Sequence, residues 1–214
     1  MYQHIDGHAW RHIYIVGDLH GCLQVLMARL REVHFDPWKD LLISVGDLID
    51  RGPDSPGCLA LLGKKWFRAV MGNHEAMALE CLESGHTFSW SMNGGEWYYQ
   101  LDHPERRAVL DDLARCVSLP LVLELKTQGK TIVVAHADYP ADSYLWEQSV
   151  EREAVLWSRT RIQHNIQGKG KWIPGADAFY FGHTPIQTPL HFHNQHYIDT
   201  GAVFGNTLTL VAVQ

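Results

Sequence analysis

The sequence predicts an α/β fold, because short apolar segments rich in β-branched residues alternate with segments of helical pattern in the first half of the chain. The segments that fit buried strands are His12–Val16, Leu41–Val45, Phe67–Met71, Thr131–Ala135 and Phe179–Phe181. Polar motifs follow these segments directly. Because ligands of open α/β sheets bind beyond the carboxyl ends of strands, the fold pattern and the position of the motifs agree.

Helices are predicted between the early strands, over Leu23–Val33 and Cys58–Trp66. The last part of the chain instead predicts antiparallel strands over His191–His193, Gln195–Asp199 and Thr207–Val213. No linker or repeat separates these parts, so we expect a single domain over residues 1–214.

Residues 81–119 interrupt the strand–helix rhythm. They carry Trp90, Trp97, Tyr98 and Tyr99, followed by a helical pattern over Pro104–Arg115. The segment could form a helical cap beside a site or a subdomain with a small core of its own, and we expect the second.

The composition excludes several classes of protein. The 214 residues are 46% hydrophobic and 20% charged, and the net charge of −6 argues against a dedicated nucleic-acid binder. The 4 cysteines are far apart and form no CxxC pair, which argues against a thiolate metal cluster and a disulfide framework. The first ten residues do not resemble a signal peptide, and no segment is long enough to cross a bilayer. We expect a cytoplasmic monomer without membrane partners.

The first predicted strand is followed by two residues of types that bind metals. Asp18 and His20 are two residues apart, and the alternation of a strand points both side chains the same way, so that they can hold one cation. Gly21 then allows a tight turn into the next helix. Taken alone, this pair would fit an ordinary exposed loop equally well.

The second motif follows the next strand. Asp47 has two carboxylate oxygens, so it is suited to bridge two cations. Arg51 offers a planar fork of donors that matches phosphate oxygens, and Asp50 is better placed as the partner of an imidazole than as a ligand. The alternative is an exposed Asp–Arg turn before Pro53.

The third motif places Asn73 and His74 side by side, so their side chains diverge. Asn73 can give its amide oxygen to a metal, while His74, held by a carboxylate such as Asp50, can act as a general acid. We expect Glu75 only to start the following helix. A lone histidine is more often a loop residue with structural partners, but the flanking glycine and glutamate favour a functional role here.

Two later histidines also end predicted strands. His136 follows Thr131–Ala135, and His183 follows Phe179–Phe181 and Gly182. Either could be structural, but the repeated placement favours metal ligation. Arg159 and Arg161 are both possible phosphate ligands, and their spacing does not separate them.

Together these motifs resemble the phosphoprotein phosphatase branch of the metallophosphoesterases, in particular the small bacterial and phage-lambda-type serine/threonine phosphatases. The resemblance covers nearly the whole chain. It rests on GDLHG from Gly17, GDLIDRG from Gly46, GNHE from Gly72, VAHA around His136, Trp157–Arg159, Gly182–Thr184 and Tyr197–Phe204.

The resemblance implies a four-layer αββα fold around two metal ions. Asp18, His20 and His183 would hold one metal, Asn73 and His136 would hold the other, and Asp47 would bridge them. Arg51 and Arg159 would clamp the phosphate, which favours Arg159 over Arg161. His74, with Asp50, would protonate the departing alkoxide.

The expected activity is single-step hydrolysis of phosphate monoesters on serine or threonine of proteins or peptides, by hydroxide held between the two cations. Mixed Asp, Asn and His ligands without thiolate favour manganese, with iron, zinc, nickel and magnesium as alternatives. Where larger relatives carry glycines after the later histidine, this chain has Ala137 and Asp138, and it lacks their C-terminal extensions. Their protein-substrate grooves therefore do not transfer to it.

Two rival functions remain open at the level of sequence. A hydrolase of dinucleoside polyphosphates would need a nucleobase pocket, for which Trp90, Trp97 and Tyr98 are candidates. A catalytically silent phosphopeptide-binding module would be expected to lack His74, Asp50 or a metal ligand, and the chain has all of them.

Overall fold

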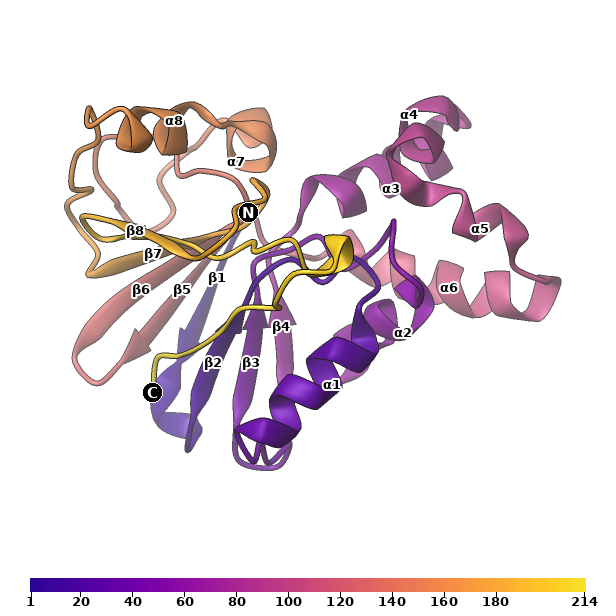
Figure 1. Cartoon of the computed structure of the whole chain (residues 1–214), viewed down its shortest axis with the longest axis horizontal. Coiled ribbons are helices and arrows are strands. Elements are labelled where there is room, and N and C mark those ends of the chain that lie inside the picture. The colour runs from indigo at the N-terminus through magenta and orange to yellow at the C-terminus, as the bar shows by residue number, and fades with distance from the viewer.

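Two mixed β-sheets pack face to face, and helices cover the outer face of each sheet (Figure 1). The computed structural model describes residues 1–214. One sheet has four strands in the order β10-β2-β3-β4, and the other has six in the order β1-β5-β6-β7-β9-β8. This arrangement is the predicted four-layer αββα sandwich.

The strands have the following bounds: β1 Tyr2–Asp6, β2 Ile13–Val16, β3 Leu41–Ser44, β4 Phe67–Ala69, β5 Val122–Thr127, β6 Lys130–Ala135, β7 Ala178–Phe181, β8 Leu190–Phe192, β9 Gln195–Tyr197 and β10 Leu210–Ala212. Strands β2, β3 and β4 run parallel, and β10 joins β2 antiparallel. In the other sheet β6, β7 and β9 run parallel. The parallel strands bring the polar motifs that follow them to one end of the sandwich.

The helices are α1 Leu23–Glu32, α2 Ser55–Leu59, α3 Asn73–Ser84, α4 Phe88–Trp90, α5 Trp97–Gln100, α6 His103–Cys116, α7 Arg152–Trp157 and α8 Thr160–Ile166. Short 3₁₀ turns lie at Gly7–Ala9, Ala60–Gly63 and Ala202–Phe204, and a π-helical turn lies at Ser91–Gly95.

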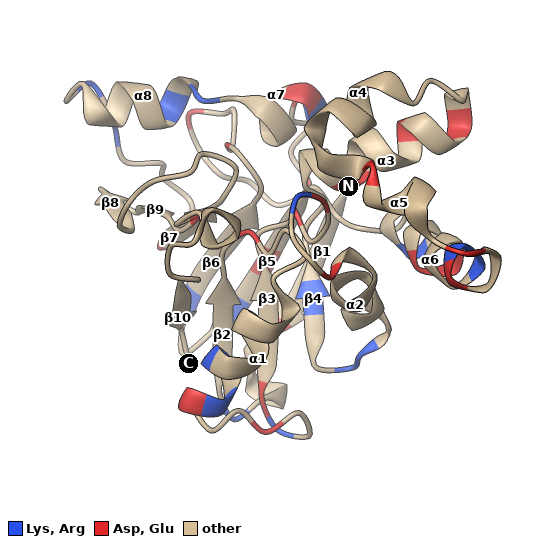
Figure 2. Ribbon diagram, turned by 45° about the vertical axis from the view of Figure 1, so that its right-hand side comes forward, with Lys and Arg blue, Asp and Glu red and all other residues tan.

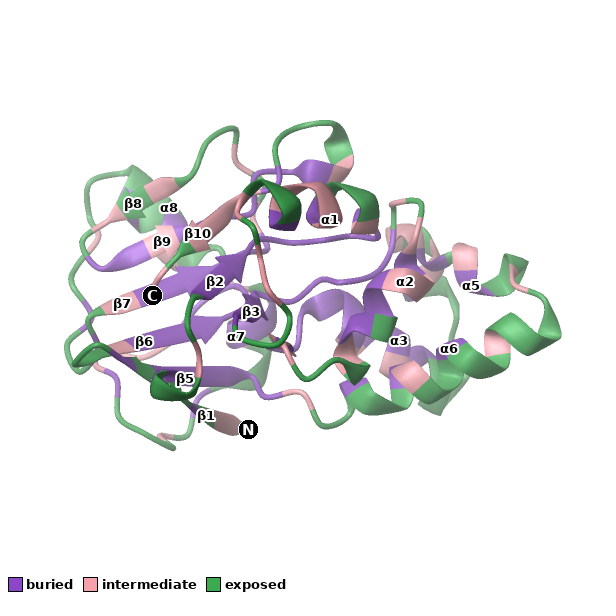
Figure 3. Ribbon diagram, turned by 90° about the horizontal axis from the view of Figure 1, so that it is seen from below, coloured by how far each residue is buried: buried purple, intermediate pink, exposed green.

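Alternation along the strands creates a core in each of the three spaces between layers. On β2, Ile13 and Ile15 belong to the core between the sheets, whereas Tyr14 and Val16 belong to the core beneath α1, α2, α3 and α6. On β6, Val134 faces the space between the sheets and Val133 faces the core beneath α7 and α8. In Figure 3 the central strands are accordingly buried (purple), whereas the outer helices carry exposed residues (green) on their solvent side.

Most predicted elements are confirmed within a few residues, but one predicted helix is wrong, and two strands and several helices were not predicted. The predicted helix Cys58–Trp66 is wrong, because α2 begins at Ser55, where the Asp54 side chain accepts from the Gly57 N–H and Pro56 lies in the first turn. It passes into a 3₁₀ turn that ends at Gly63. Strands β1 and β5 were not predicted, and they pair with each other in parallel.

The segment 81–119 does not have a separate core. Its buried side chains Trp90, Tyr98, Val109 and Leu113 belong to the same cluster as Leu26 of α1. The expectation of an independent small core is therefore wrong. Two indoles of this segment also reach the site described below.

No helix combines the length and the apolar character needed to span a bilayer. In Figure 2, lysine and arginine residues are spread over several elements, among them β4, α6 and α8, and do not gather on one of them. The net charge of the chain is −6.

Candidate metal centre

Six predicted ligands gather at one end of the sandwich, where strands of both sheets stop. Asp18 and His20 follow β2, Asp47 follows β3, Asn73 opens α3 after β4, His136 follows β6, and His183 follows β7. Each of the six is less than a tenth exposed. Buried polar groups at this density require partners, so the contacts among them define what the site can bind.

On one side of Asp47, its Oδ1 atom lies 3.3 Å from Nε2 of His136. The amide oxygen of Asn73 lies 2.8 Å from the same Nε2 and 2.9 Å from Nδ1 of His183. One ligand atom each of Asp47, His136 and His183 fall within 4.8 Å of one another. These residues, with Asn73, therefore form one candidate cation site.

On the other side, Oδ2 of Asp47 lies 3.5 Å from Nε2 of His20 and 3.9 Å from Nε2 of His74. One ligand atom from each of these three residues also lie within 4.8 Å of one another. The two oxygens of Asp47 thus face two different groups. A carboxylate that bridges two cations needs this arrangement.

The ring of His183 lies in a different group from the one expected. We expected it to share a metal with Asp18 and His20, but its imidazole faces Asn73 and His136. Only its backbone N–H reaches Asp18, at 3.1 Å from Oδ2, because the backbone turns through a left-handed conformation at His183. Gly182 makes this turn possible, since a Cβ there would lie 2.0 Å from the Asp18 carboxylate.

The imidazoles are held in a state that suits metal binding. Nδ1–H of His20 donates to the Ile49 carbonyl at 2.8 Å, and Nδ1–H of His136 donates to the Val45 carbonyl at 2.7 Å. These bonds fix the tautomer in which each Nε2 carries a lone pair on the side of the ligand groups. Burial lowers the pKa of His20 to about 4 and of His183 to about 3, so both rings are neutral at pH 7.

The pKa values of two site carboxylates, Asp47 and Asp18, are shifted in opposite directions. Burial acts to raise the pKa of Asp47, but the imidazoles of His136, His74 and His20 outweigh burial and hold it well below its usual range. Burial and the charges of Asp199 and Asp47 raise the pKa of Asp18 well above its usual range. Crowded, desolvated carboxylates of this kind are stabilised by a cation, and the donors of this chain therefore fit a pair of divalent metals.

Glu75 does more than start α3. Its buried carboxylate accepts from three backbone N–H groups, those of Asp47 at 3.0 Å, Leu48 at 2.8 Å and Gly72 at 2.9 Å. It therefore ties the loop after β3 to the start of α3. The position of Glu75 directly after Asn73 and His74 in the motif was a signal of a further role. The sequence did not reveal which backbone N–H groups its carboxylate would accept from.

His74 forms a buried pair with Asp50, as the sequence predicted. Its Nδ1 lies 2.6 Å from Oδ2 of Asp50, and both side chains are almost fully buried. The Nε2 atom of His74 is therefore directed towards Asp47 and the ligand groups. A proton donor to a leaving group at this site would have to face that way.

Backbone strain is concentrated at the same residues. Nine residues other than glycine have a positive φ, and five of them are predicted site residues: His20, Asp47, Asp50, Arg51 and His183. Left-handed conformations cost energy for residues with a Cβ and persist where surrounding contacts enforce them, commonly at functional sites.

The structure separates the two arginines that spacing could not. The guanidinium of Arg161 donates to Asp138 at 2.6 Å and to the carbonyls of Tyr139 and Ala141. Arg159 is exposed, and besides burial and His136 its charge contributes to the low pKa of His183. On the opposite side, Nη1 of Arg51 lies 2.7 Å from Nε2 of His20.

One further acidic residue of the site was missed by sequence reasoning. Asp199 follows β9, is 3% exposed, and its charge contributes, after burial, most to the raised pKa of Asp18. Its place directly beyond a strand end was the signal that could have identified it.

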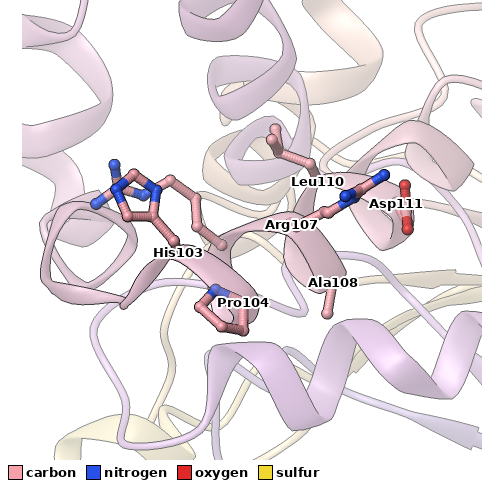
Figure 4. A pocket seen from close by; sticks show the side chains of 7 residues that line it. His103, Pro104, Arg107, Ala108, Leu110 and Asp111 are labelled. Atoms are coloured by element: carbon pink, nitrogen blue, oxygen red, sulfur yellow. The ribbon is translucent and has the colours of Figure 1, made fainter.

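A separate hollow on the outer side of α6 has a volume of about 800 Å³ (Figure 4). It is lined by residues such as His103, Arg107 and Asp111 and contains none of the candidate ligands. The candidate ligands therefore lie where the strand ends converge and not in this hollow.

The fold and the site define a phosphoesterase that uses a pair of metals. Residues 11–187 match the family model of the calcineurin-like phosphoesterases, and the chain belongs to this family.

Similar proteins cover the whole length of the chain. Serine/threonine-protein phosphatase 1 of Salmonella typhimurium is 52% identical over 100% of this chain and 97% of its own. Serine/threonine-protein phosphatase 2 of Escherichia coli is 42% identical over 100% of this chain and 98% of its own. A symmetrical bis(5'-nucleosyl)-tetraphosphatase of Ectopseudomonas mendocina is 34% identical over 73% of this chain and 56% of its own.

Among solved structures, a provisionally assigned diadenosine tetraphosphatase superposes with a TM-score of 0.74 over 99% of this chain and 93% of its own. At 22% sequence identity, this likeness shows that the fold is shared and carries no argument about substrate.

Proposed function

We propose that this protein hydrolyses phosphate monoesters on serine and threonine side chains of proteins or peptides, with two divalent cations as cofactors. One observation carries the proposal: the two oxygens of a single buried carboxylate, Asp47, face two separate groups of imidazole and amide ligands. The two full-length bacterial relatives named as serine/threonine-protein phosphatases support the substrate class.

The residues that would hold the metals are those that surround Asp47. Asn73, His136 and His183 would bind one cation, and His20, with Asp18 nearby, would bind the other. When bound, such cations lower the pKa of a water molecule towards neutrality and offset the negative charge of a phosphate group.

Two arginines would hold the phosphate. Arg51 and Arg159 lie near the two outer imidazoles, His20 and His183, respectively. Neither guanidinium pairs with a carboxylate, and apart from the Nη1 of Arg51 that faces His20, their donors are available for phosphate oxygens. Arg161 cannot serve in this way because Asp138 engages it.

His74 would supply the proton that the leaving oxygen needs. As the bond between phosphorus and the ester oxygen breaks, its electron pair stays on the oxygen, and Nε2 of His74 protonates the resulting alkoxide. Asp50 accepts from Nδ1–H of the ring and so orients it. This step matters most for serine and threonine, because their alkoxides are poor leaving groups.

Hydrolysis of dinucleoside polyphosphates is the weaker alternative. Two of the three residues that could have formed a nucleobase pocket, Trp90 and Tyr98, are buried in the core, and the third, Trp97, is held by its hydrogen bond to Asp50. A silent binding module is weaker still, because the site has an intact His74–Asp50 pair.

A comparison of turnover on a phosphoserine peptide and on diadenosine tetraphosphate, each with and without Mn²⁺, tests the proposal. We expect metal-dependent release of phosphate from the peptide at a rate well above that on the dinucleotide. Preference for the dinucleotide would overturn the proposed substrate class, and no metal-dependent turnover of any phosphate ester would overturn the activity.

Manganese is the cation we propose, because Asp, Asn and His ligands without thiolate suit metals of intermediate character. We also propose that the protein acts as a monomer in the cytoplasm, where its four buried free cysteines would stay reduced. Elemental analysis and light scattering of protein purified without added metal test the first two points.

A further inference from the structure

The carboxylate of Asp50 has an unusual set of partners. It is fully buried, and its partners include no lysine or arginine. Burying a carboxylate is costly unless donors surround it. Two of the donors here are indoles: Nε1 of Trp97 lies 2.8 Å from Oδ1, and Nε1 of Trp90 lies 2.9 Å from Oδ2 and 3.0 Å from Oδ1.

Indole N–H groups are well suited to hold a carboxylate in one orientation. An indole donates one hydrogen bond, accepts none and does not ionise, so it neither competes for the proton of His74 nor adds a charge. The two rings pack edge to face, with centroids 6.1 Å apart, and Trp90 is completely buried. Two rigid donors on one carboxylate fix the plane in which its Oδ2 meets Nδ1 of His74.

The backbone between the two tryptophans is shaped to present both indoles. Trp90 ends α4 and Trp97 starts α5, and the turn Ser91–Gly95, which is kinked at Gly94 with a φ of 101°, connects them. Gly95 packs directly on the Trp90 ring, where a Cβ would come within 2.5 Å.

The same turn also holds the neighbouring residue of the loop. The carbonyl of Gly94 accepts from the backbone N–H of Arg51 at 3.2 Å. Asp50 and Arg51 both have positive φ values, 76° and 67°, which surrounding contacts must maintain. The segment from Trp90 to Trp97 therefore contacts the strained loop at two residues. These are Asp50, the partner of His74, and Arg51, a proposed phosphate ligand.

We propose that Trp90 and Trp97 are positioning residues that orient Asp50, and through it His74, for proton donation to the leaving oxygen. This rests on the proposed phosphatase activity. Without the indole donors the Asp50 carboxylate would rotate, and Nε2 of His74 would lose its alignment with the leaving group. The chemistry that does not need the proton would continue.

The test replaces each indole with a phenyl ring, which keeps a smaller aromatic ring in place and removes the N–H: Trp90→Phe, Trp97→Phe and the double variant. Each is assayed with Mn²⁺ on a phosphoserine peptide and on p-nitrophenyl phosphate, whose leaving group needs little protonation. A general acid contributes about 100-fold to 10,000-fold to a rate. We expect the double variant to lose about 10-fold to 100-fold in kcat on the peptide and less than about threefold on the aryl ester.

Trp66→Phe is the matched control. Trp66 packs on Phe35 and Phe67 at the amino-terminal end of β4, away from the site. The Trp66→Phe variant should therefore leave both rates unchanged. Trp97 is only partly buried, so Trp97→Phe provides a folded single variant even if Trp90→Phe proves unstable. Near-ultraviolet circular dichroism and Mn²⁺ affinity confirm that each assayed variant is folded and loaded.

A variant at His74 separates the two proposals. His74→Asn should reproduce the selective loss on the peptide, and adding Trp97→Phe to it should lower the rate no further. Equal losses of Trp97→Phe on both substrates, or a full additional loss in the His74→Asn background, would overturn the positioning role alone. Equal losses of His74→Asn on both substrates would overturn the general acid and this inference with it.

Discussion

Gly72 offers a sharp test of how Asp47 is held. An alanine Cβ at this position would lie 2.2 Å from Oδ1 of Asp47 and 2.3 Å from its backbone nitrogen. The φ of Gly72 is −91°, which alanine adopts freely, so the effect of Gly72→Ala is purely steric. Real Cβ atoms essentially never come closer than 3.0 Å to such atoms, so the carboxylate must move by roughly 0.8 Å.

A displacement of this size exceeds what a metal site tolerates, because ligand distances vary by only about 0.2 Å. Overpacking of a buried contact typically costs about 1–3 kcal/mol of stability. We therefore expect Gly72→Ala to lower the free energy of unfolding by about 2 kcal/mol and to weaken Mn²⁺ binding by at least about tenfold. Urea denaturation and isothermal titration with Mn²⁺ measure the two effects.

Gly63→Ala is the control for this experiment, because an added Cβ there would meet no atom within 4 Å. It should leave metal affinity unchanged and affect stability by less than about 1 kcal/mol. If Gly72→Ala bound Mn²⁺ as tightly as the unaltered protein, the reasoning that packs Asp47 against Gly72 would be refuted.

Three other expectations concern separate features. Asp47→Asn should weaken both metal sites and reduce turnover by more than about 100-fold, and calorimetry with two resolved Mn²⁺ sites in the variant would contradict it. Arg159→Ala should raise KM for the phosphopeptide without loss of stability, whereas Arg161→Ala should destabilise the fold by about 3 kcal/mol because it removes the only cation that pairs with the buried carboxylate of Asp138; comparable KM effects would argue against the distinction. Burial and His191 lower the pKa of His196 to about 4 from 6.5, so the unfolded chain binds the proton first and stability should fall as the pH drops from 6.5 to 4; His196→Gln should flatten this dependence by up to about 2 kcal/mol, as urea titrations at several pH values would show.

The site was largely predictable because its ligands lie directly beyond apolar strands. The sequence of β2 and β3 alternates between two cores, and both strands run into motifs whose residue types are chemically explicit, such as Asp18 and Asp47. Which ligands share a metal was less accessible. The placement of the His183 ring depends on a left-handed turn that residue spacing does not encode.

The elements that were not predicted depend on distant partners. Strand β5 contains Glu124 and Lys126, and these charged residues hide the apolar pattern of a buried strand. Glu124 is nevertheless buried, because His4 and Tyr144, which are distant in the sequence, form hydrogen bonds with its carboxylate. Strand β1 is mostly polar and pairs only with β5 at the edge of its sheet.

The roles of two tryptophans were hidden for the same reason. Trp90 and Trp97 are 40 and 47 residues from Asp50, and nothing in the intervening sequence states that their indoles will meet its carboxylate. Glu75 was visible as part of a motif, but two of its three backbone partners, Asp47 and Leu48, become adjacent to it only when the loop after β3 packs on α3. Side chains that support other side chains are therefore harder to predict than metal ligands, whose chemistry the residue type displays.

The central claim is that one carboxylate joins two cation sites at the strand ends. Anomalous diffraction from crystals grown with Mn²⁺ tests it directly. We expect two peaks, one on each side of Asp47, with Asn73, His136 and His183 around one and His20 beside the other. A single peak, or peaks that do not share Asp47, would contradict the account.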